Sequence, residues 1–258
     1  MCFVKTPVFA AAVALMAALA VYEVLRAVKM THLEIVIPCV LFALAFPLKV
    51  YVSANIATGV AVLMILAIMI IQLIRFEKIS FTETATAVFV TVALSFAFGS
   101  LVFLRDGYSG INAAYLENEG IYYIAIALLS AWMTDTCAYF AGFFFGRKKL
   151  CPKVSPKKTV EGAIGGIVGC VAFNVVATLI YNLTLPEGQS YPILIIIPIS
   201  ILLSIVGMCG DLTASVIKRN VGIKDYGKIM PGHGGIMDRF DSVVFTAPAL
   251  YAVLLIIK

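Results

Sequence analysis

The feature that most constrains this chain is a series of eight apolar runs, each about as long as a membrane is thick. A helix needs about 20 mainly apolar residues to cross the hydrocarbon core of a bilayer. Of the 258 residues, 62% are hydrophobic and 13% are charged, whereas a soluble domain carries about 25% charged residues. We therefore predict an all-α, polytopic integral membrane protein with about eight transmembrane helices. The runs lie at about 7–26, 34–52, 55–74, 84–104, 120–145, 161–182, 191–212 and 236–257.

The positive charges between these runs predict which side of the membrane each loop faces. Of the 19 Lys and Arg residues, fifteen fall in alternate loops on one side and four fall on the other. Cytoplasmic loops are enriched in Lys and Arg, so we predict that the two long basic segments, about 147–160 and 211–241, are cytoplasmic. Eight spans then put both termini outside. Lys5 fits that placement poorly, which suggests the hypothesis that a ninth helix is missing upstream.

Dense polar chemistry is confined to the C-terminal half. We therefore divide the chain into N-terminal transmembrane helices (1–118) and a C-terminal catalytic region (119–258) with a cytoplasmic polar site. Six cysteines without a C-x-x-C pair, and only two histidines, argue against a zinc site.

Four polar residues fall on one face of the helix predicted to end near 220. Asp211, Ser215, Lys218 and Arg219 are spaced i, i+4, i+7 and i+8, which places them on one stripe. A carboxylate, a hydroxyl and two cations suit phosphates and a metal ion. Cations reaching toward lipid head groups would explain Lys218 and Arg219 equally well. That alternative does not explain Asp211, because an acid nearer the membrane core is costly and usually functional.

A glycine turn and two more acids follow. The glycines around His233 allow backbone N–H groups to approach an anion, although an ordinary turn has the same composition. Asp238 and Asp241 flank Arg239 and can face the same way, three residues apart. Acids near a helix start are also ordinary caps. Carboxylates with few other ligands suit Mg²⁺, which keeps waters and bridges substrate phosphates.

The basic loop and its flanking helices add further candidates. Lys157 and Lys158 are suited to nucleotide phosphates or anionic lipid, and positive-inside bias explains them equally well. Asp135 is a second intramembrane acid, whose partner is either the Asp211 site or a cation. Two overlapping G-x-x-x-G pairs predict close helix packing, within one chain or between two. They are formed by Gly162, Gly165, Gly166 and Gly169.

These segments together resemble the signature of the phosphatidate cytidylyltransferases, also called CDP-diacylglycerol synthases. The resemblance covers the C-terminal half well and the N-terminal half only as apolar helices. Glu23 also resembles a family feature that usually follows a preceding helix. The most specific part is Ser215-x-x-Lys218-Arg219-x-x-x-x-Lys224-Asp225-x-Gly227-x-x-x-Pro231-Gly232-His233-Gly234-Gly235-x-x-Asp238-Arg239-x-Asp241. Shorter similar stretches are Asp135-Thr136-x-Ala138-Tyr139, Gly146-Arg147 and Ser155-Pro156-Lys157-Lys158-Thr159-x-Glu161-Gly162.

The resemblance implies an enzyme that converts CTP and phosphatidate into CDP-diacylglycerol and pyrophosphate with Mg²⁺. It implies the cell (inner) membrane, with the active site on the cytoplasmic side. Asp211 and Asp238 would be the metal ligands, with Asp135 as a further candidate. The catalytic residues would be Ser215, Lys218, Arg219, Arg239 and Asp241. The substrate-binding residues would be Lys157, Lys158, Lys224, Asp225, Lys228, His233, Gly234 and Gly235.

The residue types agree with this chemistry. Phosphatidate already carries an anionic oxygen, so the main obstacle is its repulsion from the CTP triphosphate. Catalysis should therefore rest on positioning and charge neutralisation.

Two alternatives stay open at this point. One is a CTP-dependent enzyme that acts on another lipid phosphate or a lipid alcohol. The other is an ion-coupled transporter in which Asp135 and Asp211 bind the ion, although polar residues on one side only disfavour it. We expect no nucleic-acid partner. A second, monovalent cation and a homodimer are also left open.

Overall fold

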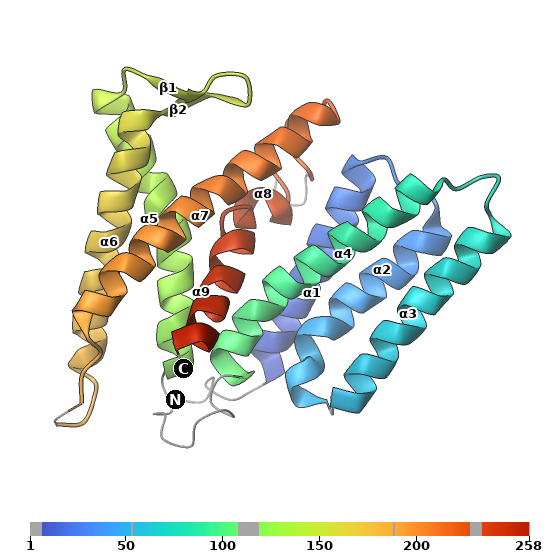
Figure 1. Cartoon of the computed structure of the whole chain (residues 1–258), viewed down its shortest axis with the longest axis horizontal. Helices are drawn as coiled ribbons and strands as arrows, with labels where there is room; N and C mark the ends of the chain where they lie inside the picture. Colours follow the sequence, from blue (N-terminus) through green and yellow to red (C-terminus); the bar gives the residue numbers. More distant parts are fainter. Residues whose placement is uncertain (1–6, 53, 108–118, 188, 228–233, 258) are drawn as a thin grey trace. The chain divides into compact units, whose positions relative to one another are not determined.

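The computed structural model describes residues 7–52, 54–107, 119–187, 189–227 and 234–257. The chain forms two compact helical units, shown in Figure 1. The first unit combines Met1–Asn112 with Val221–Arg239, and the second combines Ala113–Asn220 with Phe240–Lys258. The segment Val221–Arg239 therefore packs with the N-terminal helices, although its neighbours in sequence belong to the second unit.

The first unit is built around α1, whose buried face is rich in alanine. Small side chains let the backbones of membrane helices approach closely, and α1 contacts both α2 and α4. Ser80 and Glu83 form a capping box that begins α4, since each side chain accepts a hydrogen bond from the other's backbone N–H. The elements are α1 (Pro7–Ala27), α2 (Leu33–Ala45), the 3₁₀-helix η1 (Phe46–Tyr51), α3 (Ala54–Ile74), α4 (Phe81–Val102) and the π-helix η2 (Phe103–Gly107).

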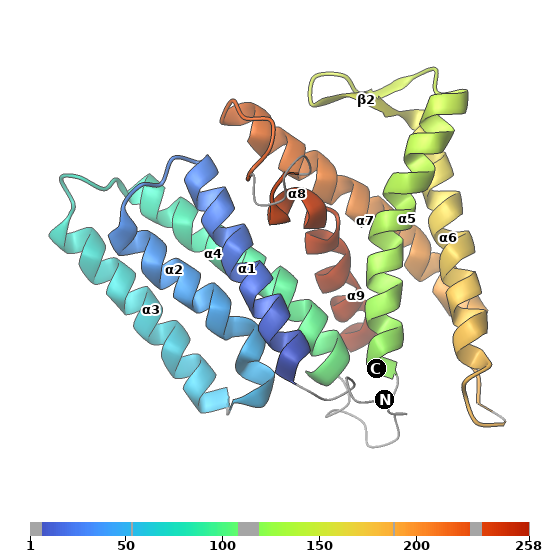
Figure 2. The same ribbon diagram turned by 180° about the vertical axis from the view of Figure 1, so that it is seen from behind.

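The second unit contains three long helices, a hairpin and a shorter helix. They are α5 (Glu119–Phe145), β1 (Lys149–Cys151), β2 (Ser155–Thr159), α6 (Val160–Asn182), α7 (Ile193–Asn220) and α9 (Val243–Ile257). The short helix α8 (Ile236–Phe240) is divided between the units in sequence, since Arg239 is assigned to the first unit and Phe240 to the second. In both views the hairpin caps one end of the α5–α6 pair (Figures 1 and 2).

Glycines bring α5 and α6 together. A Cβ atom on Gly162 would lie 2.8 Å from the carbonyl oxygen of Ala138, and one on Gly166 would lie 2.9 Å from that of Thr134. Larger side chains would therefore push the helices apart. The predicted close packing is confirmed, and it lies within one chain. The helix face that carries these glycines is covered by α5.

The predicted membrane spans agree with the helices. Six helical stretches of the described residues are long and apolar enough to cross a membrane: Pro7–Ala27, Leu33–Tyr51, Phe81–Asp106, Glu119–Phe145, Val160–Asn182 and Ile193–Asn220. Two shorter apolar helices, Thr58–Ile74 and Val243–Ile257, correspond to the third and eighth predicted runs. The chain is thus an all-α membrane protein.

The eighth predicted run is not one continuous helix. A turn at Asp241 and Ser242 separates α8 from α9. The Asp241 side chain accepts a hydrogen bond from the Ser242 N–H at 2.9 Å, which competes with helical pairing. The Ser242 carbonyl then accepts from Phe245 and Thr246 and begins α9. The turn brings Asp241 out of the regular helix and into the polar group described below.

The hairpin is a second feature that the sequence did not predict. Strands β1 and β2 pair antiparallel, with Lys149 opposite Thr159. The Thr159 hydroxyl caps α6 by accepting from the Gly162 N–H at 3.1 Å. The Glu161 carboxylate accepts from the Arg147 and Lys148 N–H groups, at 3.0 and 3.2 Å from its Oε2 atom. The basic loop is therefore an ordered element fixed to the ends of α5 and α6.

Candidate functional site

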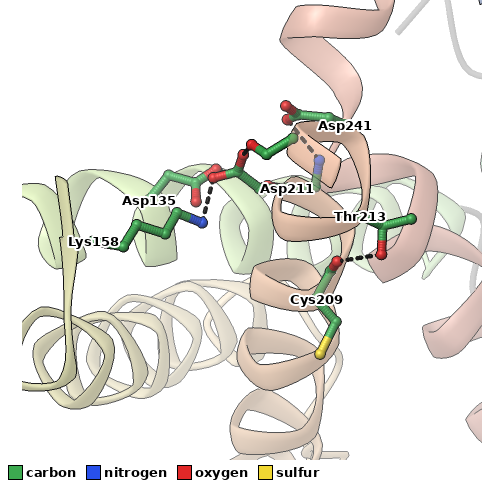
Figure 3. A network of polar contacts seen from close by, with 8 residues as sticks. Asp135, Lys158, Cys209, Asp211, Thr213 and Asp241 are labelled. Carbon is green, nitrogen blue, oxygen red and sulfur yellow. Dashed lines mark hydrogen bonds and ion pairs between the residues drawn. The ribbon is translucent and has the colours of Figure 1, made fainter. Parts of the chain in front are cut away.

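Three carboxylates from different elements form a polar group in the second unit. Asp135 comes from α5, Asp211 from α7 and Asp241 from the turn before α9. In Figure 3 Asp135, Asp211 and the Lys158 ammonium group point toward one another, and Asp241 lies on the adjoining turn. The fold thus brings together four residues that the sequence analysis had selected from separate segments.

One direct contact in this group is the ion pair between Lys158 Nζ and Asp211 Oδ2. Both side chains are partly buried, with 24% and 25% of their surface exposed. Neighbouring side chains of a strand point to opposite faces, and in β2 Lys157 is exposed while Lys158 turns inward. The structure therefore distinguishes two lysines that the sequence left equivalent.

The predicted stripe on α7 is partly realised. Ser215 donates to Asp211 Oδ1 at 3.5 Å, one helical turn away. Lys218 interacts electrostatically with Asp241, whereas Arg219 is exposed at the end of the helix. Gly222 follows α7 with a φ of +73°, a conformation that favours glycine. The stripe thus ends where the chain leaves the second unit.

Burial and neighbouring negative charge both act on Asp241, which lies outside the six candidate spans. Burial is the largest effect and raises the pKa of Asp241 to about 7. The charges of Asp211 and Asp135 raise the pKa of Asp241 further, while the positive charge of Lys218 opposes them. Asp135 is held by the Ser242 hydroxyl, which donates to its Oδ2 at 2.9 Å. A cation near these carboxylates would relieve their mutual repulsion.

The chemistry of the carboxylates suits a hard divalent ion, since Mg²⁺ prefers oxygen ligands. Within the residues that the structure describes, however, no group of three His, Cys, Asp or Glu side chains is arranged to hold a metal ion. The carboxylate oxygens are the kind of donor that Mg²⁺ prefers, and which residues bind the ion stays a prediction.

The remaining predicted residues lie in the first unit. Asp238 Oδ2 accepts hydrogen bonds from the Tyr226 N–H at 2.8 Å and the Gly235 N–H at 3.1 Å. Gly234 has a φ of +84°, so a turn requires glycine there. The side chains of Lys224, Asp225 and Arg239 are exposed. Lys228 and His233 lie outside the described residues.

Glu23 on α1 is a residue whose role sequence reasoning missed. Its side chain is only 3% exposed, and Oε2 accepts from the Met237 N–H at 3.0 Å. The available signal was a lone acid near the end of an apolar helix, where a buried charge needs a partner. The partner lies 214 positions away in sequence and is not visible from local pattern.

Comparison with known proteins gives a consistent result. A family model described as the cytidylyltransferase family matches residues 1–257. A phosphatidate cytidylyltransferase of Staphylococcus haemolyticus is 38% identical over 188 residues, covering 72% of this chain and 70% of that protein. One of Staphylococcus saprophyticus is 37% identical over the same shares of both chains. One of Staphylococcus aureus (strain COL) is 37% identical over 191 residues, covering 73% of this chain and 71% of that protein.

Proposed function

This chain belongs to the cytidylyltransferase family, and from that premise we propose that it transfers the cytidylyl group of CTP to phosphatidate. The products are CDP-diacylglycerol and pyrophosphate. The observation that carries the proposal is the partly buried Lys158–Asp211 pair among the carboxylates of α5, α7 and the turn before α9. The relatives that are 37% and 38% identical to this chain are named phosphatidate cytidylyltransferases, which supports the proposal.

The reaction makes one bond and breaks one. An anionic phosphate oxygen of phosphatidate attacks the α-phosphorus of CTP, and the bond to the bridging oxygen of the β-phosphate breaks. Pyrophosphate leaves with the bonding electrons. No proton has to be removed from the attacking group, so a strong general base is unnecessary. The task of the protein is to align the two phosphates and neutralise their charge.

The residues of this chain suit that task. We propose that Lys158, Lys218, Arg219 and Arg239 neutralise the phosphates of the two substrates, while Ser215 and Asp241 orient the groups around them. Lys157, Lys224, Asp225, Lys228 and His233 stay proposed substrate contacts, together with Gly234 and Gly235. A preorganised cation stabilises developing charge without reorganisation during the reaction.

We propose Mg²⁺ as the divalent ion, which would supply additional neutralisation of phosphate charge when bound. Asp211 and Asp238 are its proposed ligands, with Asp135 as a further candidate. The carboxylate oxygens of these residues are the donor type that Mg²⁺ prefers.

We also propose that the enzyme lies in the cell (inner) membrane with its polar group facing the cytoplasm. In the second unit the basic hairpin, the C-terminal end of α7 and the start of α9 are at the same end of the helices. Lys148, Lys149 and Lys153 are exposed there. Basic loops of this kind stay on the cytoplasmic side.

The test is pyrophosphate release by purified full-length protein in detergent. We expect release only when CTP, phosphatidate and Mg²⁺ are all present, and none when ATP replaces CTP. Asp211→Asn should lower turnover at least tenfold at limiting Mg²⁺, because it removes the charge that balances Lys158. Glu187→Gln, in the exposed loop before α7, is the matched control and should not change turnover.

Two results would contradict parts of this proposal. Near-normal turnover of Asp211→Asn at limiting Mg²⁺ would remove Asp211 from the metal site. Release with a different lipid phosphate, and none with phosphatidate, would change the acceptor while leaving the family unchanged.

A further inference from the structure

The buried carboxylate of Glu23 lies against a distant segment of the same unit. Its Oε2 atom accepts a hydrogen bond from the Met237 N–H at 3.0 Å, and the Ile236 N–H faces the same carboxylate. Among the described residues its Oε1 atom has no hydrogen-bond partner. A fully desolvated carboxylate is costly unless it is paired, so its burial here calls for an explanation.

Two glycines make room for this carboxylate. A Cβ atom on Gly227 would lie 2.7 Å from the Glu23 carboxyl carbon, and one on Gly235 would lie 2.5 Å from it. Real Cβ atoms do not approach so closely, so neither position accepts a side chain while Glu23 is in place. The Glu23 carboxylate therefore occupies space that is open only because both neighbouring residues are glycines.

The contact replaces a cap that the local sequence cannot supply. Gly235 precedes α8 and has no side chain to accept the first N–H groups of the helix. Asp238, three residues on, accepts from the Gly235 N–H at 3.1 Å, as the last residue of a capping box does. Glu23 takes the place of the missing N-cap side chain from α1, by accepting from the N–H of Met237, the second residue of the helix.

We propose that Glu23 is a positioning residue that fixes the start of α8, and through it the directions of Asp238 and Arg239. This inference rests on the proposed function, because Asp238 and Arg239 matter only if they act on substrates or metal. Hydrogen bonds to an ionised carboxylate are about twice as strong as neutral ones. Losing this charge should therefore loosen the backbone of residues 235–239 while leaving α1 in place.

The first test measures the backbone directly and needs no activity. Hydrogen–deuterium exchange of the full-length protein in detergent compares wild type with Glu23→Gln, in peptides that contain residues 235–239. Gln offers an oxygen to Met237 but removes the charge and leaves an NH₂ group without an acceptor. We expect exchange in these peptides to rise about tenfold, since hydrogen bonds to charged groups contribute about 1.5–3 kcal/mol.

The matched control is Glu34→Gln in the same unit. Glu34 is exposed and forms an ion pair with Arg75 at 2.7 Å, far from α8 in sequence and contacts. Exchange of residues 235–239 should not change in this variant. Equal exchange in wild type and Glu23→Gln would overturn the proposal.

The second test asks whether the contact serves the reaction. With equal amounts of folded protein, Glu23→Gln should lower kcat about tenfold and raise the Mg²⁺ concentration needed for half-maximal rate, while KM for phosphatidate changes less than about twofold. A general loss of stability would reduce the amount of folded protein and leave these values unchanged. Altered exchange with normal kinetics would overturn the positioning role.

A paired substitution tests the fit itself. Gly235→Ala should reduce activity more than a hundredfold, because its Cβ overlaps the Glu23 carboxylate. Glu23→Asp shortens the acid and makes room, so the double variant should recover at least tenfold over Gly235→Ala. Losses that simply multiply would show that the two positions act independently and would contradict the proposal.

The two proposals fail in different ways. If wild-type protein releases no pyrophosphate from CTP and phosphatidate, the proposed function is wrong, and the exchange experiment still decides whether Glu23 holds α8. If wild type is active and Glu23→Gln is indistinguishable from it in exchange and kinetics, only the inference about Glu23 is wrong.

Discussion

At the scale of single residues, the pair Lys157 and Lys158 shows how position in a strand separates similar side chains. Both belong to β2, and adjacent side chains in a strand point in opposite directions. Lys158 is drawn to Asp211 while Lys157 remains exposed. Removing one partner of a partly buried ion pair destabilises the protein, because the other charge is left without its counter-charge.

We predict that Lys158→Ala lowers CTP-dependent pyrophosphate release at least tenfold. The reason is that Asp211 loses its counter-charge and the substrates lose a cation. The control is Lys153→Ala, an exposed lysine in the turn of the same hairpin that is not a proposed substrate contact, and it should change the rate less than about threefold. Steady-state kinetics of both purified variants provides the comparison. Equal losses in the two variants would contradict the distinction that the structure draws.

At the scale of elements, helix packing in the second unit depends on glycine. The α6 glycines approach backbone carbonyls of α5, as the Cβ distances at Gly162 and Gly166 show. The hairpin that connects the two helices is fixed by Thr159 and Glu161. Because Lys158 directly precedes the capping threonine, its direction depends on the α5–α6 pair remaining closed.

We predict that Gly166→Leu destabilises the protein by about 1–3 kcal/mol, the usual cost of inserting atoms into a packed interface. Thermal unfolding in detergent should show a lower midpoint than wild type. Val168→Leu, on the same helix at a side chain that is 63% exposed, should leave the midpoint nearly unchanged. The prediction is wrong if the Gly166 variant unfolds at the wild-type temperature.

At the scale of the whole molecule, the sequence predicts that alternate connections between the apolar runs carry most of the positive charge. The hairpin and the loop that contains Glu187 lie at opposite ends of the α6 helix. If the second unit spans the membrane as its helix lengths suggest, these two connections face opposite compartments.

We predict that a membrane-impermeant maleimide labels Lys153→Cys only from the cytoplasmic side and Glu187→Cys only from the other side. The experiment uses a background in which the native cysteines are replaced and activity is retained, with intact cells and inverted vesicles as the two accessible faces. Labelling of both positions from one side would contradict the proposed topology.

The division into two units also separates residues of the segment that carries the family resemblance. The sequence from Ser215 to Asp241 is continuous, yet its helical start belongs to the second unit and Val221–Arg239 belongs to the first. Asp211 and Asp238 are consequently supported by different sets of neighbours. Asp211 forms an ion pair with Lys158, whereas Asp238 accepts hydrogen bonds from the backbone N–H groups of Tyr226 and Gly235. Substitutions of the two acids should therefore differ in their structural effects even if both residues bind metal.

Much of the fold could be predicted because membrane spans are a local property of sequence. The length and apolarity of each run determine whether a helix can cross a bilayer. Each of the eight runs contains a helix, although a turn interrupts the eighth. The family resemblance rested on the contiguous residues around His233 and Asp238, and the family was confirmed. The close packing at Gly166 followed from a short periodic pattern as well.

The tertiary structure decided what local pattern could not. The inward turn of Lys158, the break between α8 and α9, and the burial of Glu23 against Gly235 all depend on residues distant in the chain. The physical reason is that burying a charge or ending a helix depends on which partner is present in space. The sequence predicted which residues are candidates for the chemistry, and the folded contacts determined which charge faces which partner.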